Sequence, residues 1–294
     1  MLADPHHAAA SSFGNFLGRH GYFDRTRAEW RSSSEYCFCV ESGSQQGVER
    51  VIAVSIVSHG HGAMVQQLVE QVLACPEVSR VIVTYNIPEL LSGFPDGRVE
   101  IINNPVPKGF GANHNAAFLR CREPYWCVLN PDIELEGNPF PVLLESLRTD
   151  AVGLVAPLIK NPAGQIEDSI RHFPTLTSLA LKAWGKDNSR YELAVGAPNL
   201  CPDWVAGMFM LFRAEAFTAL KGFDEGYFLY YEDVDICVRV WKAGFKIVAL
   251  LSVSAIHDAR RASRVNWRHR RWHLKSMARY FYKFTWFSRP TESI

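Results

Sequence analysis

The chain lacks any long apolar run, since no stretch approaches the roughly 18 consecutive apolar residues that a membrane-spanning helix needs. It also lacks the basic segment followed by an apolar segment that marks a secretory signal at an amino terminus. We therefore expect a protein that stays in the cytoplasm, at most as a peripheral protein on the inner face of the membrane.

The chain also lacks a large net charge and a framework of paired cysteines. The 294 residues carry a formal net charge of only +1, which argues against a surface that binds nucleic acid in general. The cysteines are scattered, and five of the seven have the apolar or periodic surroundings of reduced, buried thiols. With 48% hydrophobic residues, the chain can bury a full core, so we expect a globular protein in a reducing compartment.

Hydrophobic periodicity is scarce in residues 1–48, so we interpret them as a poorly ordered leader. The pairs His6-His7 and Cys37-x-Cys39 lie there, but no second pair follows at the spacing of a zinc site. These residues therefore do not indicate a metal site.

From residue 51 the pattern alternates between β-branched runs and helical spacing, which is typical of a parallel sheet with right-handed crossovers. The first run, 51–57, precedes an amphipathic helix at 63–73. We expect further strands at 80–85, 99–102, 125–129, 152–156, 204–212 and 245–253. Further helices are expected to end near 120 and to span 140–147, 176–184 and 214–220.

Gly109-x-Gly111 looks like the start of a dinucleotide-binding fingerprint. However, His114 occupies the position of the third glycine, and no strand leads directly into the loop. A nicotinamide cofactor is therefore not expected.

Five carboxylates crowd among aromatic residues before and within one predicted helix, which is costly unless the charges have a task or a partner. Helical spacing begins at Val234, so Glu232 and Asp233 would stand in the first turn, where anionic groups are favoured. We interpret this stretch as the catalytic centre, although Asp233 could simply cap the helix. Asp235 differs, because Arg239 lies four residues on and can pair with it.

Three signatures occur in order along the chain: Lys108-Gly109-Phe110-Gly111 with Asn113 and Asn115, then Asn130-Pro131-Asp132, then Trp204 to Gly207 with Gly222-Phe223-Asp224-Glu225 and Glu232-Asp233-Val234-Asp235. Together they resemble a family 2 glycosyltransferase of the rhamnosyltransferase-like branch over about 51–257. The resemblance implies the α/β GT-A fold at 49–258, a Rossmann-like, mostly parallel sheet flanked by helices. It also implies an enzyme that transfers a sugar, with inversion, from a nucleotide diphosphate donor to an acceptor hydroxyl, assisted by Mg²⁺ or Mn²⁺.

The resemblance further assigns roles to single residues. Asp233 would be the general base, and Glu232 would orient the acceptor or the base. Asp132 would supply a carboxylate for the metal ion and His257 would complete that site, unless His257 is only a surface residue. Donor-binding residues would be Ser58, Asn86, Lys108, Gly109, Asn113, Asn115, Asn130 and Asp132, and acceptor-binding residues would be Trp204, Gly207, Asp224 and Glu225.

Two positions depart from the family pattern and leave the donor open. Tyr85-Asn86 stands where relatives usually have Asp-Asn, and His59-Gly60 stands where they usually have Tyr-Asn. A dTDP-rhamnose donor is the first guess and a UDP-sugar the other. The acceptor would be a glycan or a lipid-linked glycan in surface polysaccharide or glycolipid synthesis. A nucleotidyltransferase and a degenerate, non-catalytic sugar-nucleotide-binding subunit are the alternatives, although intact Asp132 and Asp233 favour catalysis.

Residues 259–294 have the pattern of a basic amphipathic helix, with no acidic residue between 259 and 290. One stripe is apolar, and basic residues lie around it. The stripe is Trp267, Leu274, Met277, Phe281 and Phe284, and the basic residues are Arg264, Arg268, Arg271, Lys275, Arg279 and Lys283. Such a helix suits an anionic membrane surface. Alternatively, the stripe packs on the catalytic domain or on a second subunit of a homodimer.

Overall fold

The computed structural model describes residues 49–89, 93–186, 189–193, 199–258 and 267–284. The predicted leader at 1–48, with both metal-like pairs, lies outside the described residues, as do 259–266 and 285–294 of the predicted tail. The five cysteines that the structure does describe are free thiols.

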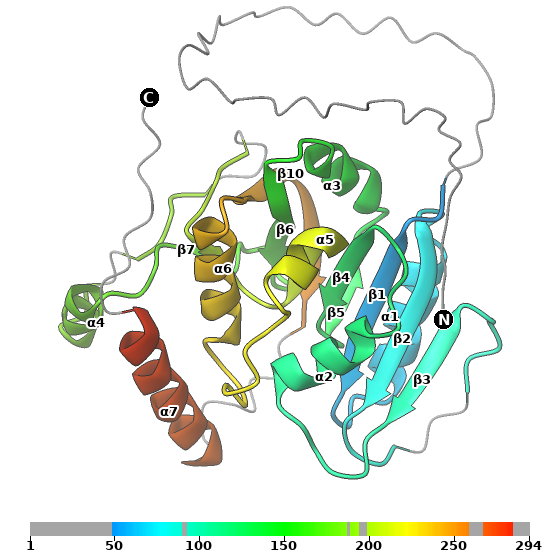
Figure 1. Ribbon diagram of the computed structural model, residues 1–294, viewed down its shortest axis with the longest axis horizontal. Helices are drawn as coiled ribbons and strands as arrows, with labels where there is room; N and C mark the ends of the chain where they lie inside the picture. Colours follow the sequence, from blue (N-terminus) through cyan, green and yellow to red (C-terminus); the bar gives the residue numbers. More distant parts are fainter. Residues whose placement is uncertain (1–48, 90–92, 187–188, 194–198, 259–266, 285–294) are drawn as a thin grey trace, which may run out of the picture. The chain divides into compact units, whose positions relative to one another are not determined.

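An eight-stranded sheet forms the centre, with the strand order β3-β2-β1-β4-β9-β6-β10-β5 (Figure 1). One half is parallel and consists of β1 (Ile52–Ser58), β2 (Val78–Tyr85), β3 (Val99–Asn103) and β4 (Tyr125–Leu129). In the other half, β6 (Val152–Lys160) runs parallel to β10 (Lys246–His257).

Two strands run against this direction. β9 (Phe209–Arg213) is antiparallel to both β4 and β6 and joins the two halves. β5 (Ile133–Leu135) is antiparallel to the end of β10. The sheet is therefore mostly parallel, as the resemblance implies.

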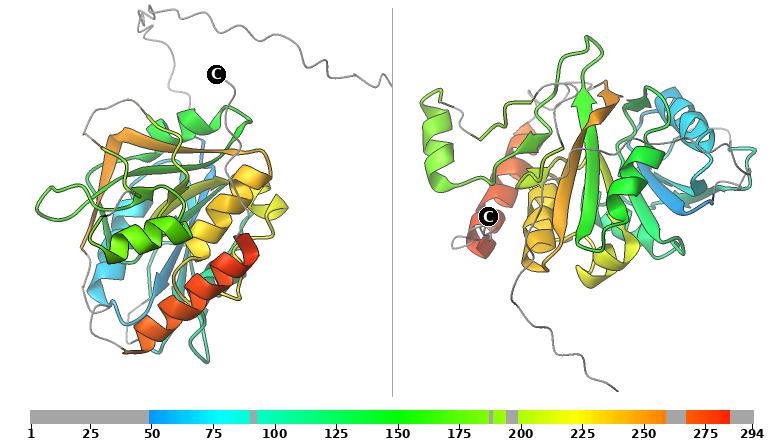
Figure 2. Two further views of the ribbon diagram at one scale, coloured as in Figure 1. Left: turned by 90° about the vertical axis from the view of Figure 1, so that its left-hand side faces the viewer. Right: turned by 90° about the horizontal axis from the view of Figure 1, so that it is seen from above.

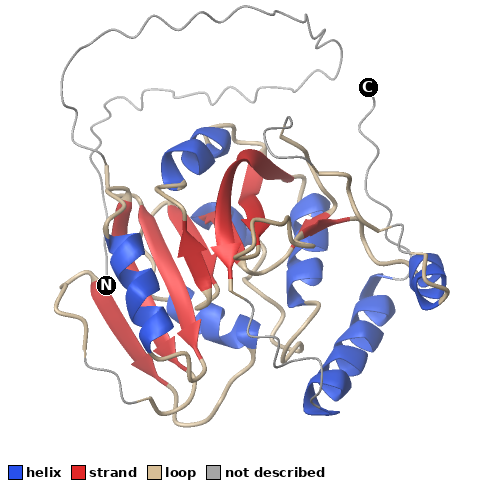
Figure 3. Ribbon diagram, turned by 180° about the vertical axis from the view of Figure 1, so that it is seen from behind, coloured by secondary structure: helices blue, strands red, loops and turns tan. Residues whose placement is uncertain are grey.

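Helices cover both faces of the sheet because successive side chains of a strand point to opposite sides. Val54 and Ile56 of β1 join the cluster that buries α1 (Ala63–Leu73) and α3 (Phe140–Leu147), and Figure 3 shows α1 on that face. The opposite face carries α2 (Phe110–Phe118), α5 (Ala214–Ala219) and α6 (Glu232–Lys242), which pack around Trp126. The sheet is thus buried between two layers.

The single strand predicted at 204–212 is wrong, because the chain turns at residues 206–208 and enters two different sheets. β8 (Trp204–Val205) pairs with β7 (Ile170–Arg171) in a separate two-stranded sheet, while β9 belongs to the main sheet. The apolar run does not reveal this break, since Val205 and Phe209 are both buried.

The predicted tail forms α7 (Trp267–Phe284), which lies beside α6 in both views of Figure 2. Its Tyr280 is buried in an apolar cluster with Tyr227, Tyr231 and residues of α6. The helix therefore packs on the catalytic domain. The predicted stripe is divided, since Trp267 and Leu274 are 68% and 58% exposed. The short helix α4 (Leu176–Ala183) begins at a capping box formed by Thr175 and Ser178. No helix within the described ranges is long and apolar enough to cross a membrane.

Candidate active site

A network of asparagine side chains fixes the loop that precedes α2. Asn86 accepts a hydrogen bond from the Lys108 amide at 2.8 Å and donates to the Lys108 carbonyl at 2.9 Å. Asn104 donates to Asn86 at 2.9 Å and to Asn113 at 2.6 Å, and Asn113 donates to the Gly109 carbonyl at 3.0 Å. The side chains of Asn86 and Asn113 thus hold the loop at Lys108, whose own side chain is exposed. Donor binding by these residues stays a prediction.

Asn115 ties α2 to the acidic segment 222–231. Its amide oxygen accepts from the Phe223 amide at 2.8 Å, and its nitrogen donates to the Phe223 carbonyl at 2.9 Å and to Glu225 at 3.0 Å. Gly222 has φ +67°, and a Cβ there would come within 2.3 Å of the Asn115 oxygen, so glycine is required. The predicted donor residue therefore positions the segment that leads to α6.

The loop after β1 is held by a side chain that the sequence did not single out. Glu89 accepts hydrogen bonds from the amides of Gly60 at 2.8 Å and Gly62 at 3.3 Å. The buried Ser58 accepts from the His61 amide at 3.3 Å, so its hydroxyl also supports this loop. A role of Ser58 in donor binding stays a prediction.

Asp233 lies in the first turn of α6 and is only partly exposed. Its two oxygens accept from the Val234 amide at 2.9 Å and from the Gly207 amide at 3.2 Å. Burial raises the pKa of Asp233, and these backbone hydrogen bonds moderate the rise. The carboxylate therefore has a fixed orientation and an increased affinity for a proton, which suits a general base.

Glu232, beside it, is almost fully buried, and burial followed by the charge of Asp233 raises its pKa well above the usual range. Among the residues that the structure describes, nothing hydrogen-bonds its Oε2. Glu232 therefore binds a proton more readily than an exposed carboxyl group does.

The structure brings Asp132 and His257 together, as predicted, and adds a third group. His257 Nε2 lies 3.4 Å from Asp132 Oδ2, and its Nδ1 lies 2.8 Å from Glu167 Oε2. Burial disfavours the charged imidazole, but Asp132 and then Glu167 outweigh it and raise the pKa of His257. His257 is therefore not a simple surface residue. Glu167 was missed because it lies 90 residues from His257 in a segment without regular periodicity.

A short backbone path connects this centre to Asp233. The amide of Asn130, two residues before Asp132, donates to the Met208 carbonyl at 2.9 Å. Met208 follows Gly207, whose amide holds Asp233. A Cβ on Gly207 would lie 3.2 Å from the Phe110 ring, which is a tight contact, and 3.6 Å from the Asp233 Cβ, which is an ordinary one. The two predicted halves of the site are thus held against each other.

The fit of a divalent ion depends on Asp132. In the described part of the chain, no group of three His, Cys, Asp or Glu side chains is arranged to hold a metal ion. However, Asp132 Oδ1 is buried and has no hydrogen-bond partner among the described residues. A cation would satisfy this oxygen, and Mg²⁺ is commonly held by one or two carboxylates together with substrate phosphates. The residues therefore fit an ion that binds with the donor.

The residues predicted to bind the acceptor have different surroundings. Trp204 donates its indole N–H to the His172 carbonyl at 2.9 Å, and Glu225 is exposed. Asp224 already has cationic partners on α7, Arg279 at 2.9 Å and Lys283 at 2.6 Å. These two contacts were not anticipated from the sequence. Acceptor binding by the predicted residues stays a prediction.

A family model described as glycosyltransferase-like family 2 matches residues 49–275. The chain is 30% identical to the rhamnosyltransferase WbbL of Escherichia coli K12 over 249 residues, which are 78% of this chain and 92% of that protein. It is 33% identical to the N-acetylglucosaminyl-diphospho-decaprenol L-rhamnosyltransferase of Mycobacterium tuberculosis over 139 residues, or 44% of this chain and 45% of that one.

Among solved structures, the chain is similar in fold to GalNAc-T7 with UDP, GalNAc and Mn²⁺, with a TM-score of 0.56 and 15% identity. The match covers 71% of this chain and 43% of that structure, so the chain spans less than half of the solved protein. At this identity the likeness concerns the fold alone, and it agrees with the mostly parallel sheet flanked by helices.

Proposed function

The chain belongs to the glycosyltransferase-like family 2, and from this membership we propose inverting transfer of a sugar from a nucleotide diphosphate donor to an acceptor hydroxyl. Rhamnose is the first candidate, because two curated relatives are rhamnosyltransferases. The acceptor proposed is a glycan or a lipid-linked glycan, since the mycobacterial relative is named for a diphospho-decaprenol acceptor.

The fixed orientation of Asp233 is the observation that carries this proposal. A carboxylate held by the amides of Gly207 and Val234, with a pKa raised by burial, can accept the proton of an acceptor hydroxyl. The hydroxyl then attacks the anomeric carbon from the side opposite the leaving diphosphate, which inverts the configuration. Burial raises the pKa of Glu232 beside the base, and its role there is to orient the acceptor or the base.

Asp132 would hold the Mg²⁺ or Mn²⁺ ion through its unpartnered oxygen, and His257 lies close enough to assist. Glu167 on the far nitrogen of His257 fixes the orientation of the ring, as an outer carboxylate commonly does for a ligating histidine. Asn130 could hold a metal-bound water. When bound, the ion neutralises negative charge that develops on the leaving diphosphate.

The donor base stays open between dTDP and UDP. Tyr85 is buried at the end of β2, where relatives usually have an aspartate. We therefore propose that other groups bind the nucleotide base. The loop at 58–62 and the exposed Lys108 are the candidates.

Part of α7 suits a membrane surface in which a lipid-linked acceptor would be presented. Trp267 and Leu274 are exposed, and the exposed Arg271 and Lys275 accompany them with no acidic residue in the helix. A basic residue near an anionic leaflet contributes about 1 kcal/mol, so binding would be weak and reversible. A cytoplasmic location at the inner face of the membrane remains part of this proposal, as does a homodimer.

The alternative functions have less support. The curated relatives are glycosyltransferases, which favours sugar transfer over nucleotidyl transfer. Asp132 and Asp233 are both present and each has defined contacts, which supports catalysis over a degenerate binding subunit.

A donor panel tests the proposal without an acceptor. The chain would be incubated with Mn²⁺ and each of several nucleotide sugars, and slow hydrolysis would be followed by release of the nucleotide diphosphate. We expect hydrolysis of dTDP-rhamnose or of one UDP-sugar, and its loss with Asp132→Ala. Absence of hydrolysis and of donor binding across the panel would contradict the proposal.

A further inference from the structure

The segment 222–231, which leads into the candidate base, rests along α7. Ser276 donates its hydroxyl to the Leu229 carbonyl at 2.9 Å, and the Tyr230 hydroxyl lies 2.9 Å from His269 Nδ1. The rings of Phe228 and Trp272 lie 4.7 Å apart. These contacts reach the segment at three successive residues.

The end of this segment has an unfavourable backbone conformation. Tyr230 and Tyr231 have φ angles of +71° and +66°, in the left-handed region that residues with a side chain rarely adopt. Tyr231 directly precedes Glu232 and occupies the N-cap position of α6, without a capping hydrogen bond from its side chain. Two adjacent residues stay in this region only when their surroundings hold them there. The contacts with α7 provide such support, and Tyr231 also packs against Tyr280.

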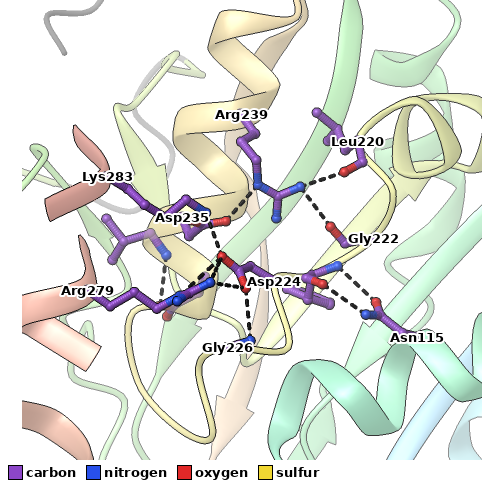
Figure 4. A network of polar contacts seen from close by, with 12 residues as sticks. Asn115, Leu220, Gly222, Asp224, Gly226, Asp235, Arg239, Arg279 and Lys283 are labelled. Carbon is purple, nitrogen blue, oxygen red and sulfur yellow. Dashed lines mark hydrogen bonds and ion pairs between the residues drawn. The ribbon is translucent and has the colours of Figure 1, made fainter. Parts of the chain in front are cut away.

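Two cations of α7 contact Asp224 near the start of the segment, and one of them, Lys283, also contacts the first turn of α6 (Figure 4). Arg279 contacts both oxygens of Asp224 at 2.9 Å. The Lys283 amine lies 2.6 Å from Asp224 and also bonds Asp235. Asp235 is fully buried and lies in the same turn of α6 as Asp233. Arg239 also pairs with Asp235, at 2.6 Å.

We propose that Arg279 and Lys283 are positioning residues for Asp233. Through one amine, Lys283 links Asp224, near the start of segment 222–231, to Asp235 in the first turn of α6, and Arg279 fixes Asp224. Without them, Asp224 loses both cationic partners and Asp235 keeps only Arg239, so the left-handed turn at Tyr230 and Tyr231 can relax. Asp233 then loses its orientation toward the acceptor. This inference rests on the proposed function for the role of Asp233, but not for the conformation of the segment.

The basic residues of α7 fall into two groups, those that contact carboxylates of the catalytic domain and those that remain exposed. Arg279 and Lys283 are directed at carboxylates of the catalytic domain, so they are not available to a lipid surface. The exposed Arg271 and Lys275 form no ion pair with a carboxylate in the described part of the chain, so they remain available to a lipid surface.

The test compares Lys283→Met and Arg279→Met with Arg270→Met, a control that removes one positive charge from an exposed position of the same helix. Transfer to a soluble acceptor would be measured at saturating donor. We expect kcat to fall by about 10- to 100-fold in the first two variants, since misplacement by about 1 Å can cost that much. The KM for the donor should stay within about twofold, because Asp132 is untouched. Lys283→Arg should restore most of the rate.

Hydrogen exchange gives a second result that does not depend on activity. The Asp235 amide donates to the Tyr231 carbonyl at 2.8 Å, and this region should exchange faster in Lys283→Met than in the parent and in Arg270→Met. Unchanged exchange would overturn the inference, as would an unchanged kcat in an active parent. If the parent has no transfer activity but Lys283→Met still exchanges faster than the parent, the proposed function is contradicted, while the positioning of segment 222–231 by Lys283 is supported. A fall in melting temperature with normal kcat would show a structural role only, and would also overturn it.

Discussion

Asp224→Asn should destabilise the protein by removing the carboxylate that Arg279 and Lys283 hold. Burial alone would raise the pKa of Asp224, but hydrogen bonds from Lys283, the Gly226 amide and Arg279 lower it from 3.8 to about 2. One pKa unit corresponds to about 1.4 kcal/mol, so the ionised carboxylate contributes about 2 kcal/mol at neutral pH. The Asp224 side chain is 17% exposed but that of Arg279 is 42% exposed, so solvent screening makes about 2 kcal/mol an upper value for this contribution.

The pH dependence has a definite direction. Because the pKa is lower in the folded state, the stabilisation is fully present above the unfolded value of about 3.8 and is lost as the pH falls through about 2. The difference in unfolding free energy between parent and Asp224→Asn should therefore be about constant from pH 7 to pH 4.5. By pH 3 it should shrink to about half.

Urea unfolding at pH 7, 4.5 and 3 measures this difference. Glu215→Gln is a suitable control, because Glu215 is exposed and has no ion pair among the described residues. We expect the control to match the parent within about 0.5 kcal/mol. Equal stability of Asp224→Asn and parent at pH 7, or a difference that does not decrease at pH 3, would refute the reasoning.

Three further predictions concern the site and the surface. Asp233→Asn should lower the rate of transfer about 10²- to 10⁴-fold while donor affinity stays nearly intact, and transfer within threefold of the parent would exclude the base role. The kcat/KM of the parent should rise with pH as Asp233, whose pKa is raised, loses its proton. Asp132→Ala should lose the strengthening of donor binding by Mn²⁺ in calorimetry, whereas a parent indifferent to chelator would contradict the metal role. Arg271→Gln with Lys275→Gln should weaken co-sedimentation with anionic vesicles at 0.1 M salt and change nothing at about 1 M, where the screening length is about 3 Å; equal sedimentation at both salts would limit α7 to packing.

Helices were predicted correctly from the sequence where the spacing of apolar residues alone determines the structure. The helix at 63–73 was placed with the boundaries of α1, and 140–147 with those of α3, because each repeats apolar residues at helical spacing between clear breaks. The pairing of Asp235 with Arg239 was also predicted and is confirmed at 2.6 Å. These features depend only on residues near one another in the chain.

Features that depend on distant residues were missed or misplaced. β5 exists because three residues pair with the far end of β10, more than 100 residues later. The inward face of α7 was predicted only in part, since Met277, Phe281 and Phe284 of the predicted stripe pack on the buried cluster. Spacing alone could not show that the small, polar Ser276 is buried while Leu274 is exposed. Ser276 is buried because it donates to the Leu229 carbonyl, a contact that no local pattern reveals.

Inversion at the anomeric carbon is the central claim, and the configuration of the transferred sugar tests it most directly. Parent protein would be given the donor identified by the panel and a synthetic acceptor with N-acetylglucosaminyl diphosphate on an alkyl chain. Proton NMR of the isolated product would then give the configuration at the new glycosidic bond. The account predicts the configuration opposite to that of the donor, because Asp233 activates a hydroxyl that attacks from the opposite face. A product with the donor's configuration would contradict it.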